Sequence, residues 1–416
     1  MTSRQGPDLA LARGAIADTL HGHHVIGVAV SGGGDSMALL HMAQQVAAGT
    51  GSGIAAVTVD HALRSGSAAE AAQVATYCAA HGIAHETLIW RHQGLRGNLQ
   101  AAARDARYAL MAQWARDQGI AAILLGHTQD DQAETFLMRL GREAGLDGLS
   151  GMAPRMQRNG VTWHRPLLGT SRATLRDYLR QVGLGWSDDP SNEDTRFDRI
   201  KARQALPALL PLGIDAAGIS RVMAQLDEAR IALRHLLRDV ARSTIRQDHG
   251  DLILDWPALA SHPVEVQRRC VVDALVWMSG ASYPPRRDDV AKLIHALQAD
   301  GQRTLAGCLI RRKGKDLRLS REWQAVRDLV GPTDALWDGR WCLEGPHDAA
   351  LHVRALGDAG LLACPDWRNA DVPRATLLAS PAIWAADRLV AAPLAGFGQG
   401  WRARIVADFH DRPVSH

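Results

Sequence analysis

The stretch "VIGVAVSGGGDSMALLHMA", residues 25–43, runs from apolar residues through three glycines into a helical pattern. From residue 24 to about 145, short apolar runs alternate with longer amphipathic ones, which is typical of a parallel sheet covered by helices. The predicted strands are "HVIGVAV" (24–30), "GIAAVTV" (53–59), "AHETLIW" (84–90) and "IAAILLG" (120–126). Because ligands of such sheets bind beyond the carboxyl ends of the strands, we expect a site at the glycine turn.

The chain has 416 residues, a length that favours two or three domains over a single hydrophobic core. Three are expected. Residues 1–207 form an α/β, Rossmann-like catalytic domain, and residues 208–330 form a basic helical domain that ends in a β-hairpin around Lys313–Lys315. Residues 331–416, rich in Trp, Gly and Pro, form a small domain of mixed or mostly β structure.

Charge is spread unevenly along the chain. Residues 199–327 hold 22 Lys and Arg against 14 Asp and Glu, whereas the whole chain has a net charge of only +3. Such a segment suits a polyanion such as RNA, because Lys and Arg contacts to phosphate supply most non-specific affinity. A solvated helical surface is the alternative interpretation. The cluster "RRKGK", Arg311 to Lys315, favours RNA because it lies at a predicted turn.

The cysteines and the apolar runs indicate a cytoplasmic protein. Five cysteines are widely scattered without a C-x-x-C pair, which suits reduced, mostly buried thiols. The longest aliphatic runs are far too short to span a membrane. The N-terminus lacks the uninterrupted apolar stretch of a secretory signal.

The turn "SGGGDS", Ser31 to Ser36, has the properties of a phosphate site. Glycines allow the backbone to approach a ligand closely, successive amides bind anions, and the following helix adds a partial positive charge. Asp35 beside bound phosphates would be repulsive unless a divalent cation lies between them, and Mg²⁺ is the expected one. The alternative is a merely structural turn.

Several motifs of this chain resemble those of one family. "SGGGDS" is similar to the signature of N-type ATP pyrophosphatases, which cleave ATP to AMP and pyrophosphate. With its companions, the sequence resembles the tRNA(Ile)-lysidine synthetase family, densely over residues 25–207. The companions are "VDHALR" (59–64), "NLQAAARDARY" (98–108), "GHTQDDQAETFLMRL" (126–140), "GLDGLSGM" (145–152), "RPLL" (165–168) and "DPSN" (189–192).

The resemblance implies an ATP-dependent ligase. Its reaction joins the side-chain amine of free lysine to C2 of the wobble cytidine in the isoleucine tRNA with a CAU anticodon, through an adenylated cytidine. AMP and pyrophosphate are released, and codon reading changes from AUG to AUA. ATP, Mg²⁺, lysine and this tRNA are the expected ligands, without a membrane, and the chain is a monomer or a homodimer.

The resemblance and the spacing together assign candidate residues. His127 and Asp131 are spaced at i and i+4 next to the fourth predicted strand, with Asp130 beside them, and Arg104 and Arg107 are neighbours at i and i+3 on one helix face. The expected catalytic residues are Asp35, Arg107, His127 and Asp131. The expected ATP-binding residues are Ser31, Gly32, Gly33, Gly34, Asp35, Ser36, His61 and Arg64. Asp35, with Asp130 as a second candidate, is expected to bind Mg²⁺, and tRNA is expected at Arg104, Arg199, Arg203, Arg311, Arg312 and Lys313.

The chain departs from the family pattern at three positions. Glu143 and Ala144 stand where the family has a Gly-Ser pair, and Ile200 replaces an Asn. Two other functions compete with the ligase. A tRNA thiolase would need a reactive cysteine near the loop, and only Cys78 is available. An RNA-binding protein with a dead ATPase site is opposed by the intact loop and by the His127–Asp131 cluster.

Overall fold

The computed structural model describes residues 5–60, 66–91, 99–187, 196, 198–281, 283–297, 299, 301–406 and 408–411. The chain divides into two compact units, Met1–Arg230 and Ile231–His416. The three domains expected from the sequence, with their two boundaries, stay predictions.

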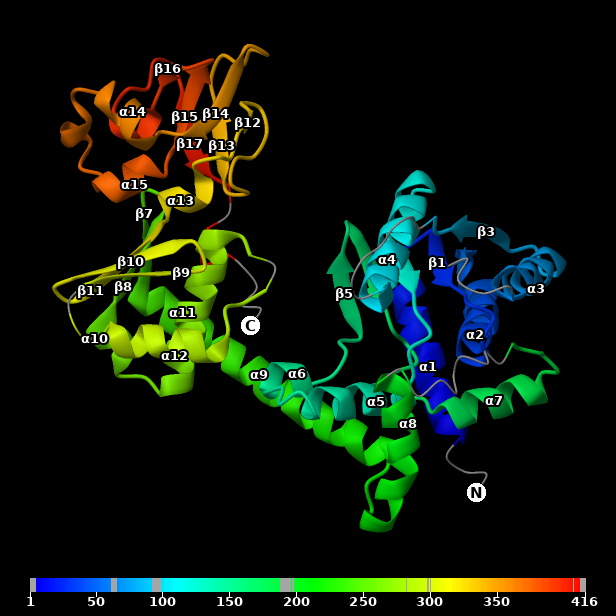
Figure 1. The fold of residues 1–416 in the computed structure, drawn as a ribbon. Helices are drawn as coiled ribbons and strands as arrows, with labels where there is room; N and C mark the ends of the chain where they lie inside the picture. Colours follow the sequence, from blue (N-terminus) through cyan, green and yellow to red (C-terminus); the bar gives the residue numbers. More distant parts are fainter. Residues whose placement is uncertain are drawn as a thin grey trace. The chain divides into compact units, whose positions relative to one another are not determined.

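The first unit is built on a six-stranded sheet in the order β3-β2-β1-β4-β6-β5 (Figure 1). The four predicted strands are confirmed, and β5 alone runs antiparallel, at the edge beside β6. The hairpin of β5 and β6 was not predicted, because "RMQRNGVTWH" has few apolar residues. The strands are β1 (Val25–Ala29), β2 (Gly53–Asp60), β3 (Ala84–Ile89), β4 (Ala122–Leu124), β5 (Arg155–Arg158) and β6 (Val161–His164).

Helices cover both faces of this sheet. One core cluster joins β1 to four helices, and the apolar run Met37–Met42 lies inside it. The opposite core is built on helix α4 and contains the edge-to-face pair Tyr108–Trp163, whose ring centroids are 4.7 Å apart. The four helices of the first face are α1 (Gln5–Leu20), α2 (Gly34–Thr50), α3 (Ser67–Ala80) and α7 (Arg172–Gln181), and α4 is Leu99–Asp117.

A third group of helices packs beside the sheet. Ala133 of α5 contacts Ile219 and Met223 at the start of α9 in a small buried cluster. The Gln132 side chain donates to the backbone oxygen of Met152 and accepts from its N–H, which fixes the turn after α6. The elements are α5 (Gln129–Leu140), α6 (Leu146–Leu149), α8 (Asp198–Leu209), the 3₁₀ turn η2 (Leu210–Leu212) and α9 (Ala216–Thr244).

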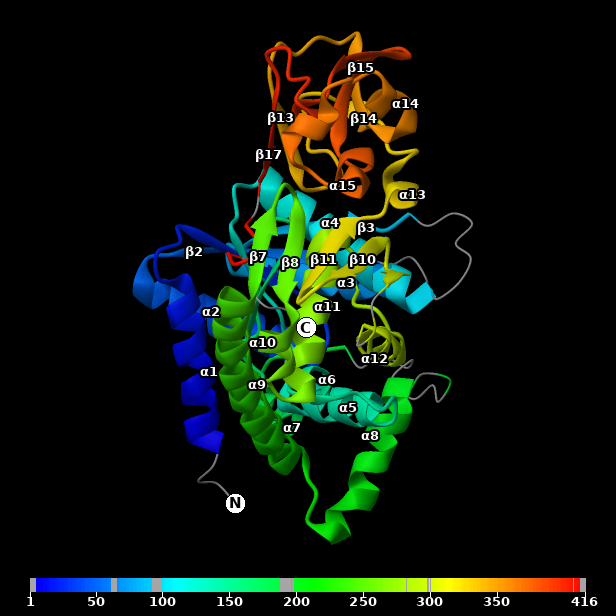
Figure 2. The same ribbon diagram turned by 90° about the vertical axis from the view of Figure 1, so that its left-hand side faces the viewer.

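The second unit contains a five-stranded antiparallel sheet in the order β7-β8-β11-β10-β9 (Figure 2). The predicted hairpin is confirmed as β10 and β11, whose Lys313 and Asp316 pair beside the turn. Helix α11 packs on this sheet and buries Leu275 against Leu254 and Leu319. The elements are β7 (Ile245–Asp248), β8 (Asp251–Asp255), α10 (Trp256–Ala260), α11 (Val264–Ser279), α12 (Arg287–Ala296), β9 (Gln302–Leu305), β10 (Cys308–Lys313) and β11 (Asp316–Arg321).

The last part of the chain is a small mixed region within the same unit. Its two sheets have the orders β12-β14-β15-β16 and β13-β17. Buried Asp251 of β8 accepts hydrogen bonds from Arg318, Ser320 and Thr376, so β8 is tied to this region. The elements are α13 (Trp323–Val326), β12 (Gly331–Pro332), β13 (Trp341–Glu344), β14 (Leu351–Ala355), α14 (Gly357–Leu362), η3 (Trp367–Ala370), α15 (Arg374–Leu378), β15 (Pro381–Ala385), β16 (Arg388–Ala391), η4 (Pro393–Ala395) and β17 (Arg402–Ile405).

The thiols and the helices bear on two further predictions. In the part of the chain that the structure describes, all five cysteines are unpaired and four are buried. None of the described helices is by itself long and apolar enough to cross a membrane. One bent pair, Asp198–Leu212 with Ala216–Thr244, meets that test of length and composition only when its two members are joined.

Candidate active site

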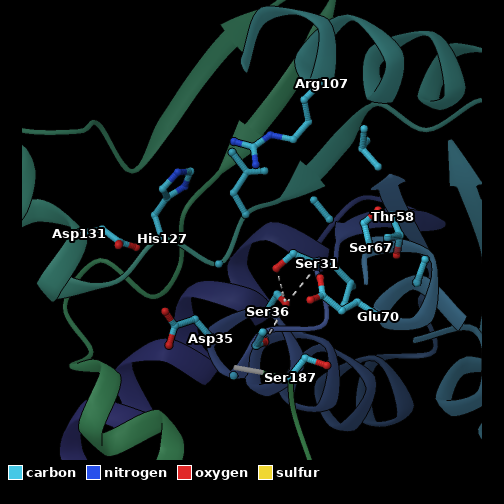
Figure 3. A pocket seen from close by; sticks show the side chains of 18 of the residues that line it. Ser31, Asp35, Ser36, Thr58, Ser67, Glu70, Arg107, His127, Asp131 and Ser187 are labelled. Atoms are coloured by element: carbon cyan, nitrogen blue, oxygen red, sulfur yellow. Dashed lines mark hydrogen bonds between the residues drawn. The ribbon is translucent and has the colours of Figure 1, made fainter. Parts of the chain in front are cut away.

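The glycine turn is a preformed loop between β1 and α2. Gly32 has a φ of +86°, which an L side chain rarely adopts. The Ser36 hydroxyl donates to the Gly33 oxygen at 2.9 Å and accepts from the Ser31 N–H at 3.1 Å, as the dashed lines of Figure 3 show. These bonds close the loop around the start of α2, a geometry suited to binding an anion.

Distant segments pack against this loop. The Ser187 N–H donates to the Gly32 oxygen at 3.0 Å. A Cβ at Gly126 would lie only 3.3 Å from the backbone of Asp35 and Ser36, so this position needs glycine for a close approach. The segments that follow β4 and α7 therefore pack on the loop, in addition to β1 from which it starts.

A cavity of about 470 Å³ opens at the carboxyl ends of β1, β2 and β4. Ser31 and Ser36 lie between Thr58, Ser67 and Glu70 on one side and His127 and Asp131 on the other (Figure 3). The predicted residues that line it are Ser31, Gly33, Gly34, Asp35, Ser36, Arg107, His127, Asp131, Arg199 and Arg203. Gly32, Arg104 and Asp130 are outside the cavity lining, and His61 and Arg64 lie outside the described residues.

Asp35 is a candidate cation ligand. Its Oδ2 accepts from Arg172 at 3.2 Å, whereas its buried Oδ1 has no hydrogen-bond partner among the described residues. Burial raises the pKa of Asp35, Arg172 lowers it and Asp131 raises it again, with a net rise. Mg²⁺ is commonly held by one or two carboxylates together with substrate phosphates, so an unpartnered carboxylate oxygen beside an anion-binding loop fits it.

Helix α5 carries an acidic cluster that arginines neutralise. Asp131 accepts from the Thr128 N–H in a capping box, and its other oxygen accepts from Arg172 and Arg199, both at 2.9 Å. Glu134 is fully buried and accepts from the Nε atoms of Arg199 and Arg203, both at 2.7 Å. These charges are paired as buried carboxylates must be.

Asp130 binds the backbone at the start of α7. Its Oδ2 accepts from the backbone N–H of Arg172 at 2.6 Å, at the start of α7. The role of Asp130 as a second Mg²⁺ ligand stays a prediction.

His127 faces the cavity in a positive environment. Its Nδ1 is buried, and no hydrogen-bond partner for it occurs within the described ranges. Burial, and then the surrounding guanidiniums, lower the pKa of His127 well below its usual value; the cations are Arg165, Arg104, Arg199 and Arg107. Burial, with Arg104 next, also lowers the pKa of Arg107. The imidazole is therefore neutral at physiological pH and can accept a hydrogen bond.

The residues predicted to bind tRNA lie in both units. Arg199 and Arg203 of α8 point to Glu134, and their side chains stay about one-third exposed. On the hairpin, Arg311 and Lys313 are exposed, whereas Arg312 donates to the backbone oxygens of Leu297 and Gly314. Their contacts with tRNA stay predictions.

Sequence reasoning missed Arg172, which contacts three carboxylates of the site. One signal was available: Arg172 is the first residue of α7, after the N-cap Ser171, and a helix start disfavours a cation. Thr58, Ser67, Glu70 and Ser187, which also line the cavity, carried no comparable signal.

The chain was compared with known proteins. A family model described as a PP-loop domain matches residues 11–210. The chain is 49% identical to the tRNA(Ile)-lysidine synthase of Ruegeria pomeroyi over 94% of both chains. The chain belongs to the tRNA(Ile)-lysidine synthase family. The enzyme of that name from Mesorhizobium japonicum is 38% identical over 91% of this chain and 85% of its own.

A solved structure of lower similarity is the U34-tRNA thiolase NcsA from Methanococcus maripaludis with its [4Fe-4S] cluster. It has a TM-score of 0.46 and 14% identity, and covers 54% of this chain and 80% of its own. At that level it carries no inference.

Membership of the tRNA(Ile)-lysidine synthase family confirms the sequence-based assignment, and the PP-loop domain makes this an ATP-using chain.

The structure shows the surroundings of two residues that depart from the family pattern. Glu143 has a φ of 56°, the left-handed region that favours the glycine it replaces. Ile200 is buried and lines the cavity, so it presents a methyl surface where the family has an amide.

Proposed function

We propose that this chain joins the side-chain amine of free lysine to C2 of the wobble cytidine in the isoleucine tRNA with a CAU anticodon. ATP is cleaved to AMP and pyrophosphate in the process. One observation carries the proposal: the phosphate loop lines the same cavity as neutral His127, whose Nδ1 has no hydrogen-bond partner in the described part of the chain. The family membership and the motifs agree with it.

The first step activates the cytidine. Its C2 oxygen attacks the α-phosphorus of ATP, the bond to pyrophosphate breaks, and an adenylated cytidine forms. The amides of Ser31–Ser36 are suited to the leaving pyrophosphate, because fixed donors at a helix start stabilise developing negative charge without reorganising. A Mg²⁺ at Oδ1 of Asp35 would neutralise charge on the phosphates.

In the second step, the lysine amine attacks C2 and AMP leaves. The amine is a nucleophile only when neutral, and nearby cations disfavour an ammonium ion. The arginines that lower the pKa of His127 would lower the pKa of the lysine ammonium in the same way. Neutral His127 can accept a hydrogen bond from this amine and orient its lone pair.

The tRNA would contact basic groups around this cavity and in the second unit. Arg199 and Arg203 are held by Glu134 but remain partly exposed, so phosphate can approach them. Exposed Arg311 and Lys313 add a second positive patch. ATP, lysine and tRNA meet in the cytoplasm, which is the proposed location.

Thiolation is disfavoured by the chemistry of Cys78. Burial raises the pKa of this thiol to about 11, so the thiolate that sulfur transfer needs is scarce at neutral pH.

The proposal is tested with purified protein, the CAU-anticodon isoleucine tRNA, ATP, Mg²⁺ and radiolabelled lysine. We expect ATP-dependent label in the tRNA. Asp35→Ala should lower pyrophosphate release at least about 100-fold, as when one stabilising group of an active site is removed, and leave tRNA affinity within about twofold.

The matched control is Asp177→Ala, on the exposed side of α7, which should behave as the unaltered chain. Wild-type protein that puts no lysine into the tRNA would refute the ligase function. Equal loss of tRNA binding and pyrophosphate release in Asp35→Ala would contradict the role given to Asp35.

A further inference from the structure

Arg172 links the phosphate loop to the acidic cluster of α5. Each of its three guanidinium nitrogens contacts a different carboxylate: Nε donates to Asp35 at 3.2 Å, Nη2 to Asp131 at 2.9 Å and Nη1 to Glu134 at 3.3 Å. Its backbone N–H is held by Asp130. The side chain is only 18% exposed, so both its ends are fixed.

This set of contacts requires arginine. A guanidinium presents donors in a planar fork, whereas a lysine ammonium is a single point charge on a flexible stem. One lysine nitrogen cannot occupy the three positions at which these carboxylates are now bound.

The location of Arg172 also indicates a role beyond folding of α7. A cation in the first turn of a helix opposes the helix dipole, at a cost of a few tenths to about 1 kcal/mol. The remaining turns of α7 bury Leu175 and Leu179 in the core and do not depend on a charge at position 172.

We propose that Arg172 is a positioning residue. It holds Oδ2 of Asp35 and thereby leaves Oδ1, which has no partner among the described residues, to receive the divalent cation of ATP bound in the cavity that Asp35 lines. Arg172 lines the same cavity, but in this role it acts through Asp35 rather than by binding the cation itself. It fixes the direction of Asp35 by anchoring it to Asp131 and Glu134, which α5 holds rigidly. The inference rests on the proposed function in one respect: the cavity must bind a complex of ATP with a divalent metal ion.

The test measures binding of Mn²⁺–ATP to the full chain without tRNA, from the loss of the EPR signal of free Mn²⁺. Arg172→Lys keeps the charge but loses the fork. We expect its affinity for Mn²⁺–ATP to fall about 10-fold or more, the range for loss of a hydrogen bond to a charged group. The control Arg180→Met removes an exposed arginine of the same helix and should bind as the unaltered chain.

A double-mutant cycle separates positioning from a general effect on structure. Asp35→Asn should itself weaken Mn²⁺–ATP binding. If Arg172 acts through Asp35, adding Arg172→Lys to Asp35→Asn should cause less than a twofold further loss. Additive losses, or an unchanged affinity in Arg172→Lys, would overturn the proposal. Thermal unfolding of each variant verifies that it is folded, and Arg172→Lys retains the charge that the carboxylates need.

The outcome is independent of the ligase assay. Wild-type protein that binds Mn²⁺–ATP without labelling tRNA would defeat the proposed function and leave the role of Arg172 intact. Lysine incorporation with undiminished Mn²⁺–ATP binding in Arg172→Lys would defeat only the inference about Arg172.

Discussion

At the scale of single residues, His127 shows how the site sets its own chemistry. The imidazole is surrounded by guanidiniums and has no hydrogen-bond partner for Nδ1 within the described residues. Proton uptake by the folded protein is therefore costly, whereas the unfolded chain takes up a proton near pH 6.5. The neutral form is thus a property of the fold.

This difference predicts a pH dependence of stability. Because the pKa of His127 is lowered by folding, the free energy of unfolding should fall as pH drops below about 6.5. His127→Gln should reduce that slope by up to about 1.4 kcal/mol per pH unit. Urea titrations at several pH values provide the measurement, with His81→Gln, at an exposed position, as control. An unaltered slope in His127→Gln would contradict a buried neutral imidazole.

Residue-scale prediction from the sequence succeeded where a motif is local. His127 and Asp131 were predicted next to the fourth strand and both line the cavity at the end of β4, whereas their catalytic roles stay predictions. Arg172 could not be found in this way, because its partners Asp35, Asp131 and Glu134 come from other elements. Its environment exists only after folding brings α2, α5 and α7 together.

At the scale of elements, the hairpin of β10 and β11 carries basic side chains in two different environments. The side chains of Arg311 and Lys313 are exposed, whereas Arg312 binds backbone oxygens of its own unit. The first two are available to phosphate, and the third supports the turn. The sequence alone placed all three in one basic cluster.

We therefore expect Arg311→Gln with Lys313→Gln to weaken tRNA binding and to lower the dependence of log Kd on log salt by about 1.4–1.8, since each phosphate contact contributes about 0.7–0.9. The measurement is tRNA affinity at several salt concentrations, with exposed Arg388→Gln as control. An unchanged slope would remove the hairpin from the interface.

Elements with a clear period were predicted best. The strands of the parallel sheet have apolar runs bounded by polar turns, and all four were found. The hairpin of β7 and β8 was not, because "IRQDHGDLILD" directly continues the long helical pattern of α9. Its second strand, β8, is placed by pairing with β11, a long-range contact that local periodicity does not contain.

At the scale of the whole molecule, the chain is two units with separate hydrophobic cores. Leu40 is fully buried in the core around α2, and Leu254 is fully buried against α11. Each unit therefore has the apolar interior that an independent cooperative transition needs.

Calorimetry should show two unfolding transitions. Leu254→Ala should destabilise the second unit by about 2–5 kcal/mol, as cavities in packed cores do, and lower only one melting temperature. Leu40→Ala should lower the other. A single transition that both substitutions shift equally would mean that the units unfold together.

The packing of distant segments on the phosphate loop has a consequence for synthesis. The loop leaves the ribosome among the first forty residues, but Gly126, Arg172 and Ser187 must follow before it is enclosed. A nascent chain, or a fragment truncated before these residues, would contain the sequence SGGGDS but not the assembled phosphate site. ATP binding is thus postponed until nearly half of the polypeptide has been translated.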